Sequence, residues 1–228
     1  MPVPWRSKEP SRIEGFSDAV FGFALTLLVV SLETPKDFAQ LREQMAGFVP
    51  FALMFAMVCW IWYEHNVFFR RYGLQGPWTV FLNCVLLFVV LFYVYPLKFL
   101  TIALVGRMLG VVDAPDIANS DWPVLMVLYS SGVLVIFTVF LLLHWHAWRQ
   151  RYVLDLDERE RLQLQFGARS HGLSAGIAAV SLVLVALPIP PAWSGLIYCL
   201  MGPAHGWNGY RAGRAQERLK AGISAPAE

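Results

Sequence analysis

The sequence predicts an all-α membrane protein with six transmembrane helices and both termini in the cytoplasm. Three observations support this fold class: an apolar composition, long apolar blocks, and an uneven distribution of Lys and Arg around those blocks. Hydrophobic residues make up 57% of the 228 residues and charged residues only 15%, whereas about 25% is usual in soluble domains. A transmembrane helix needs about 20 mainly apolar residues. Six blocks approach or exceed that length: residues 14–32, 48–69, 79–105, 122–148, 170–189 and 191–209.

The first block follows the polar start of the stretch RIEGFSDAVFGFALTLLVV, which runs from Arg12 to Val30. Ser17 and Asp18 interrupt its apolar residues near one end, and only Thr26 is polar after them. A signal peptide would have a short apolar core and a small-residue cleavage site. Here the apolar residues continue to Leu32 and the sequence ETPKD follows, so we expect a membrane span.

The segments between the blocks carry local helix signals. In TPKDFAQLREQMAG, Thr34 is the expected N-cap of a short outer helix that has Pro35 at its first position. After the fourth block, VLDLDERERLQLQFG is expected to extend that span as a cytoplasmic helix, supported by the i,i+4 pairs Asp155–Arg159 and Asp157–Arg161. Only PIPPAWSG separates the fifth and sixth blocks, which predicts a tight hairpin.

The orientation follows from the excess of Lys and Arg on the cytoplasmic side of membrane proteins. With the N-terminus inside, only Lys36, Arg42, Lys98 and Arg107 of the 18 Lys and Arg residues lie on the outer side. The net charge of +2 therefore reflects topology and does not indicate nucleic-acid binding. We expect a cytoplasmic N-terminal segment (1–11), a six-helix membrane domain (12–209) and a cytoplasmic tail (210–228) whose last residues, AGISAPAE, are disordered.

Several polar residues inside the first three spans are expected to meet. A charged group in a span is costly and normally pairs with another polar group, and Asp18 lies six residues from Arg12, on a different helical face. Trp62 and His65 share a face of the second span, and Asn83 is an isolated amide in the third. We expect Arg12, Ser17 and Asp18 to dock against these three residues, either only to hold the helices together or to move ions or protons directly.

These residues also resemble a known family. RIEGFSD fits the R-x-x-x-F-S-D signature of the transmembrane protein 175 family, the endosomal and lysosomal potassium channels and their prokaryotic homologues. Arg12, Phe16, Ser17 and Asp18 are its fixed positions, WYEH matches the family's W-x-x-H on the second helix, and Asn83 matches its asparagine on the third. The resemblance covers residues 12 to about 100; the later helices agree only in number and orientation.

The resemblance implies a potassium-selective channel of the bacterial inner membrane, assembled as a homotetramer whose pore is lined by the first helix. At 100° per residue, one stripe of that helix consists of Ala19, Phe23, Thr26, Leu27 and Val30. With the pore that the resemblance implies, the expected pore-lining residues are Phe23, Thr26, Leu27 and Val30. The stripe of Asp18 and Gly22 is expected to point into the protein. Bulky apolar groups around a pore suit a hydrophobic gate that closes by dewetting. Family members mostly carry Ile or Leu where this chain has Phe23.

Other functions remain alternatives. A proton-coupled secondary transporter would use Asp18 and His65 as a relay, but the sequence lacks the paired broken helices typical of carriers. No T-V-G-Y-G stretch occurs, so potassium selection would need another route. An enzyme is not expected, since His144 and His146 point in different directions on a helix and Cys59, Cys84 and Cys199 lie within spans. The sequence implies no cofactor and no metal beyond permeant potassium.

Overall fold

A computed structural model describes residues 9–30, 35–109, 115 and 117–223. All regular secondary structure in these residues is helical. In chain order the helices are α1 (Arg12–Val30), α2 (Phe38–Ala46), α3 (Phe48–Tyr72), α4 (Pro77–Leu109), α5 (Trp122–Arg149), α6 (Glu158–Ala186), α7 (Ala192–Leu196), the 3-10 helix η1 (Ile197–Leu200) and α8 (Met201–Ile223).

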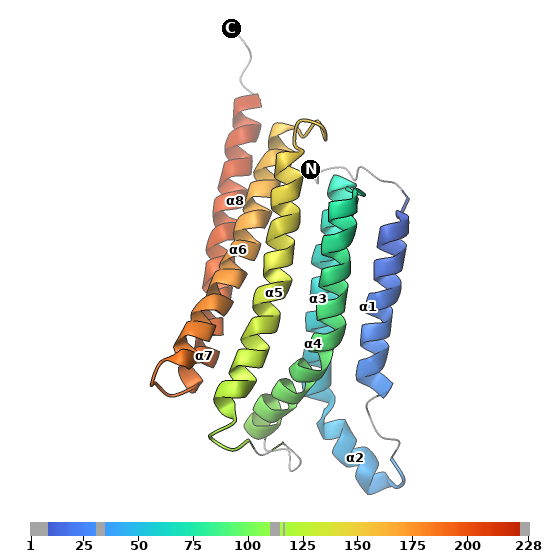
Figure 1. The fold of residues 1–228 in the computed structure, drawn as a ribbon, viewed down its shortest axis with the longest axis vertical. Coiled ribbons are helices and arrows are strands. Elements are labelled where there is room, and N and C mark those ends of the chain that lie inside the picture. Colours follow the sequence, from blue (N-terminus) through green and yellow to red (C-terminus); the bar gives the residue numbers. More distant parts are fainter. Residues whose placement is uncertain (1–8, 31–34, 110–114, 116, 224–228) are drawn as a thin grey trace.

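The long helices lie side by side in one elongated bundle (Figure 1). α1 is at one edge, where it packs on α3 and α4, and α4 also packs on α5. α6 lies between α5 and α8, so α8 forms the opposite edge. The beginning of α1 and the end of α8 lie at the same end of the bundle, and α2 and α7 lie at the other (Figure 1).

Four of the described helices are long and apolar enough to cross a membrane, namely α3, α4 as far as Val105, α5 and α6. The protein is therefore a multi-pass membrane protein. α1 is not among these four, and it carries the charged residues Arg12, Glu14 and Asp18. The predicted sixth span is divided into α7, η1 and the first part of α8.

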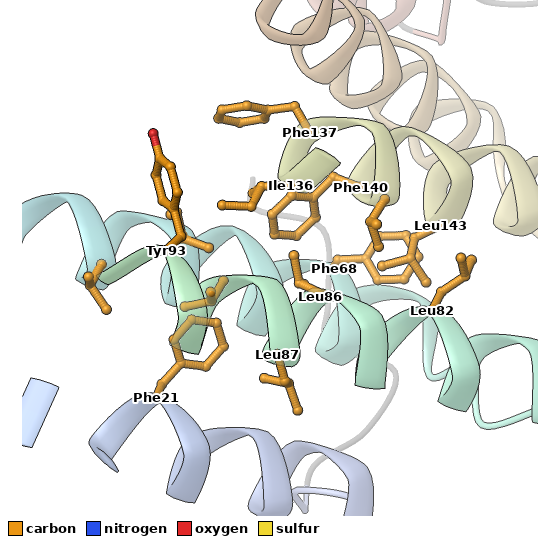
Figure 2. Packing of buried hydrophobic residues seen from close by; sticks show 14 of the residues in the cluster. Phe21, Phe68, Leu82, Leu86, Leu87, Tyr93, Ile136, Phe137, Phe140 and Leu143 are labelled. Carbon is orange, nitrogen blue, oxygen red and sulfur yellow. The ribbon is translucent and has the colours of Figure 1, made fainter. Parts of the chain in front are cut away.

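The core joins helices that are far apart in the sequence. Phe21 of α1 lies near Leu87 of α4, and Phe68 of α3 lies near Phe140 and Leu143 of α5 (Figure 2); all five side chains are buried. Lipid tails are as apolar as these side chains, so such a core stabilises a membrane bundle mainly by close packing.

One glycine shows how close the packing is. The Cβ of an alanine at Gly132 would collide with the ring of Tyr93. Gly132 therefore permits the close approach of α5 to α4, on which Tyr93 lies. The Tyr93 hydroxyl donates a hydrogen bond to the Tyr129 carbonyl, 2.9 Å away, across the same contact.

The segment after α5 is not the helical extension that the sequence predicts. The chain turns over residues 150–155, Asp155 has a positive φ of 44°, and Asp157 is the N-cap of α6. Asp157 accepts a hydrogen bond from the Glu160 amide while the Glu160 carboxylate accepts one from the Asp157 amide. This reciprocal capping box starts a new helix, so residues from Glu158 onward extend the fifth span and not the fourth.

Two further local predictions need correction. Asp37, and not Thr34, is the N-cap of α2, because its carboxylate accepts a hydrogen bond from the Gln40 amide at 2.8 Å; Thr34 lies outside the described residues. The predicted cytoplasmic tail is helical as far as Ile223, since α8 continues to that residue. The first three residues of AGISAPAE therefore belong to a helix.

Candidate ion pathway and its supporting network

α1 is attached to the bundle by one face. Its buried side chains recur every three or four residues, as one face of a helix requires; they are Glu14, Ser17, Phe21, Ala24 and Leu28. The helix begins with a capping box in which the Ser11 amide donates to the Glu14 carboxylate at 2.7 Å and the Glu14 amide donates to the Ser11 hydroxyl at 3.3 Å. This cap brings a carboxylate into the buried face beside the helix N-terminus, where negative charge is favourable.

A buried chain of hydrogen bonds links α1, α3 and α4. His65 Nε2 lies 2.8 Å from Asn83 Oδ1, and Asn83 Nδ2 donates to Ser17 Oγ at 3.0 Å. Ser17 Oγ in turn donates to the Ile13 carbonyl at 2.7 Å. Because the amide oxygen only accepts, His65 donates its Nε2–H in this arrangement. Each of the three side chains is at most 1% exposed. Water does not reach their polar atoms, so these atoms need one another as hydrogen-bond partners.

Asp18 has a separate partner at the edge of this network. Its carboxylate accepts a hydrogen bond of 2.7 Å from the indole Nε1 of Trp62. Asp18 is exposed in the single chain, which corrects the expectation that it points into the protein. The buried face of α1 is centred on Ser17 and Phe21, and the Asp18–Gly22 stripe lies beside it. Arg12 is exposed at the first residue of α1.

The opposite side of α1 is open. Phe23 is 67% exposed and Val29 51% exposed. Thr26 is exposed and its hydroxyl donates to the Gly22 carbonyl at 2.8 Å, while Leu27 is half-buried. The signature residue Phe16 is also exposed, at 57%. The side chain of Val30 lies outside the described part of the structure. Within the part of the chain that the structure describes, Phe23, Thr26 and Val29 are left exposed.

Comparison with known proteins places this arrangement in a family. Residues 12–96, which include α1, α3 and most of α4, match the model of the family described as endosomal/lysosomal potassium channel TMEM175. A protein of Marivirga tractuosa named a potassium channel is 39% identical over 188 residues, which are 79% of this chain and 76% of the relative. The chain belongs to the TMEM175 family.

Further relatives and solved structures agree with this result. A potassium channel of Streptomyces collinus is 25% identical over 185 residues, covering 76% of this chain and 84% of that protein. The crystal structure of a variant of the potassium channel MtTMEM175 has a TM-score of 0.82 at 35% identity, over 92% of this chain and 97% of the other. The TMEM175 homologue from Chamaesiphon minutus has a TM-score of 0.56 at 22% identity, over 88% and 96% of the two chains, and shows the shared fold.

The present chain also contains a histidine cluster that its sequence did not predict. The rings of His144 and His171 have centroids 4.8 Å apart, and His171 Nε2 lies 3.8 Å from the Glu64 carboxylate. These residues come from α5, α6 and α3, so no spacing along one helix reveals their contact. Among the residues that the structure describes, no group of three or more His, Cys, Asp or Glu side chains has the geometry to hold a metal ion.

Proposed function

We propose that this chain forms a potassium channel in a bacterial cell membrane, as a homotetramer with α1 of each subunit lining a passive central pore. Membership of the TMEM175 family supports this function, because the relatives from Marivirga tractuosa and Streptomyces collinus are both named potassium channels. Within each subunit, residues 12–209 form the channel domain, flanked by cytoplasmic segments 1–11 and 210–228.

The open face of α1 is the observation that carries the proposal. In a single subunit in a bilayer, Asp18 and Thr26 would lie at the surface of a helix at the edge of the bundle. A charged side chain facing lipid is unfavourable, and such residues normally face a bundle interior or a water-filled cavity. Further copies of the chain around α1 provide both environments, with Thr26 towards the water and Asp18 towards the neighbouring helices.

The pore constriction in this proposal is made by Phe23. Its ring is largely exposed in the single subunit, and a ring of such side chains around the axis would form an apolar plug that stays dry when closed. One turn further on, Thr26 presents hydroxyl groups that replace part of the hydration shell of an ion. Leu27 and Val30 complete the pore lining towards the C-terminal end of α1.

In this proposal the signature residues hold α1, the pore-lining helix, against the rest of its subunit. The bonds among Ser17, Asn83 and His65 hold the cytoplasmic half of α1 against α3 and α4, and the Trp62–Asp18 bond fixes the rotation of α1 about its axis. Arg12 and Phe16 belong to the same network in the assembled channel, where their exposed side chains meet neighbouring subunits.

Six spans per subunit and two cytoplasmic termini complete the proposal. α1 is the first span, and α7, η1 and the first part of α8 form the sixth. An even number of passes agrees with the position of both ends of the described chain at one end of the bundle (Figure 1). That end is cytoplasmic because it carries most of the Lys and Arg residues.

Flux from liposomes tests the function. Purified protein is reconstituted with potassium or sodium inside, and efflux is measured with and without a pH difference across the membrane. A channel gives downhill potassium flux that exceeds sodium flux and does not depend on a proton gradient. Flux that requires the gradient would instead establish the proton-coupled transporter, with Asp18 and His65 as the groups to replace first.

A further inference from the structure

A groove with a strong positive charge lies at the edge of the bundle opposite α1. It is formed between the N-terminal part of α6 and the C-terminal part of α8 and has a volume of about 810 Å³, within the ~300–1,000 Å³ typical of small-molecule sites. The argument uses six of its lining residues: Phe166, Trp207, Tyr210, Arg211, Arg214 and Arg218.

The contacts of α8 relate the groove to the ends of the neighbouring helices. Asn208 donates a hydrogen bond to the Phe166 carbonyl at 3.0 Å, so the two helices are level at these residues. A Cβ added at the next residue, Gly167, would lie 2.6 Å from the ring of His144, near the end of α5. Trp145 lies at the same level. Aromatic side chains gather at the boundary between lipid tails and water, and the exposed Trp207 and Tyr210 on α8 are typical of that boundary.

Three arginines continue along α8 beyond this boundary. Arg211, Arg214 and Arg218 are spaced three and four residues apart, so they share one face with Trp207. All three are exposed, and one carboxylate, that of Glu158, also lines the groove. Like charges at these spacings repel one another. A bound anion between them would relieve the repulsion.

The direction of α8 decides where such an anion lies. Side chains on a helix lean towards its N-terminus, and the N-terminal part of α8 lies beside α6, one of the apolar spans. Arg211, Arg214 and Arg218 therefore lean back towards the membrane surface.

We propose that this groove binds the headgroup of an anionic phospholipid. Guanidinium groups bind phosphate oxygens in a bidentate manner, and basic clusters directly beyond a membrane span are typical of anionic-lipid sites. Arg211 and Arg214 bind the phosphate, Arg218 adds charge from the following turn, and an acyl chain lies against Phe166 and Trp207. A soluble phosphate would gain nothing from this aromatic wall, which favours a lipid as the occupant.

Lipid binding to the full-length protein tests the proposal. The protein is purified in a neutral detergent and titrated with phosphatidylglycerol or phosphatidylcholine, and bound lipid is counted by native mass spectrometry. We expect selective binding of phosphatidylglycerol. Replacing both arginines, Arg211→Gln and Arg214→Gln, should weaken it about 30-fold, because each arginine near a membrane surface contributes about 1 kcal/mol. The control Arg149→Gln with Arg159→Gln removes the same charge outside the groove and should retain binding.

Each remaining outcome has a definite meaning. Equal weakening in the two double variants would overturn the site, because general surface charge would then explain binding. Unchanged binding in the groove variant would overturn it as well. If glycerol phosphate at millimolar concentration prevented lipid binding, the lipid would be overturned as the occupant, and the groove would be a site for a soluble phosphate ester. If the glutamine variant does not fold, Arg211→Lys with Arg214→Lys keeps the charge, and a several-fold loss of affinity for phosphatidylglycerol is expected because lysine cannot make the bidentate contact; unchanged affinity would overturn the arginine–phosphate contact.

Discussion

Replacing Asn83 by Leu tests the hydrogen-bond chain that holds α1. Leu has a similar size, so the change removes polarity with little change in packing. Ser17 keeps its hydrogen bond to the Ile13 carbonyl, but the Nε2–H of His65 loses its partner while the ring is only 1% exposed. One unsatisfied buried donor costs about 1–3 kcal/mol. At ~2–4 °C per kcal/mol for a chain of this size, the melting temperature should fall by about 2–12 °C.

The size of this effect is checked by thermal melting of purified protein, followed by size-exclusion chromatography. The neighbouring variant Cys84→Leu is the control, because Cys84 is exposed and a surface change usually stays within ~0.5 kcal/mol. Combining Asn83→Leu with His65→Phe should restore most of the stability. Removing both polar partners can be nearly neutral, and His65 already lies among aromatic rings, 5.6 Å from Phe21 and 4.4 Å from Phe69 between ring centroids.

Additive losses in the double variant would refute this reasoning. They would show that the stability depends on the shape of each side chain and not on the bond between them. A melting temperature of Asn83→Leu equal to that of Cys84→Leu would do the same. Coupling between residues in direct contact is usually ~0.5–3 kcal/mol, which the melting curves resolve.

Four other substitutions have definite expected outcomes. Asp18→Leu should yield less assembled protein on size-exclusion chromatography than Asp18→Asn, which still offers an oxygen to its indole donor; equal yields would contradict the role of this bond. Phe23→Ala should raise both potassium and sodium flux in liposomes, and unchanged flux in folded, tetrameric protein would exclude α1 from the constriction. Thr26→Val should lower the ratio of potassium to sodium flux while assembly stays intact; an unchanged ratio would exclude its hydroxyl from selectivity. Gly132→Ala should destabilise the protein to heat by about 1–3 kcal/mol, because the ring of Tyr93 occupies the place of the new methyl group; an unchanged melting temperature would show that the ring moves aside freely.

The meeting of Ser17, Asn83 and His65 could be predicted from the sequence because isolated polar groups in apolar spans have few possible partners. The direction in which the Asp18 side chain points could not be predicted from the sequence. A helical wheel gives the angles between side chains of one helix, but the direction of the core depends on where the other helices lie. The predicted inward stripe of Asp18 and Gly22 is therefore displaced from the buried face that Ser17 and Phe21 form.

The helix start at Glu158 could have been found from its local sequence. Asp157 and Glu160 have the spacing of a capping box, and this signal is stronger than the i,i+4 charge pairs that favoured one continuous helix. The contact between His144 and His171 had no such signal. It depends on the register between α5 and α6, which several contacts share: His144 packs against Gly167, and the Ser130 and Ser181 hydroxyls lie 2.8 Å apart. Neither helix alone indicates this register.

The unequal attachment of α1 along its length gives the helix a pivot. Directional bonds hold it at Ser17, within its first two turns, whereas the side chains of Ala24 and Leu28 further along are buried by apolar contact, which tolerates sliding. Phe23 lies six residues from Ser17, about 9 Å along the axis, and Val30 about 20 Å. A tilt of ~10° about Ser17 would carry Phe23 sideways by about 1.6 Å and the end of the helix by more than 3 Å. In the proposed pore, a slight tilt of α1 about Ser17 would therefore change the pore radius by an amount comparable with the radius of a water molecule.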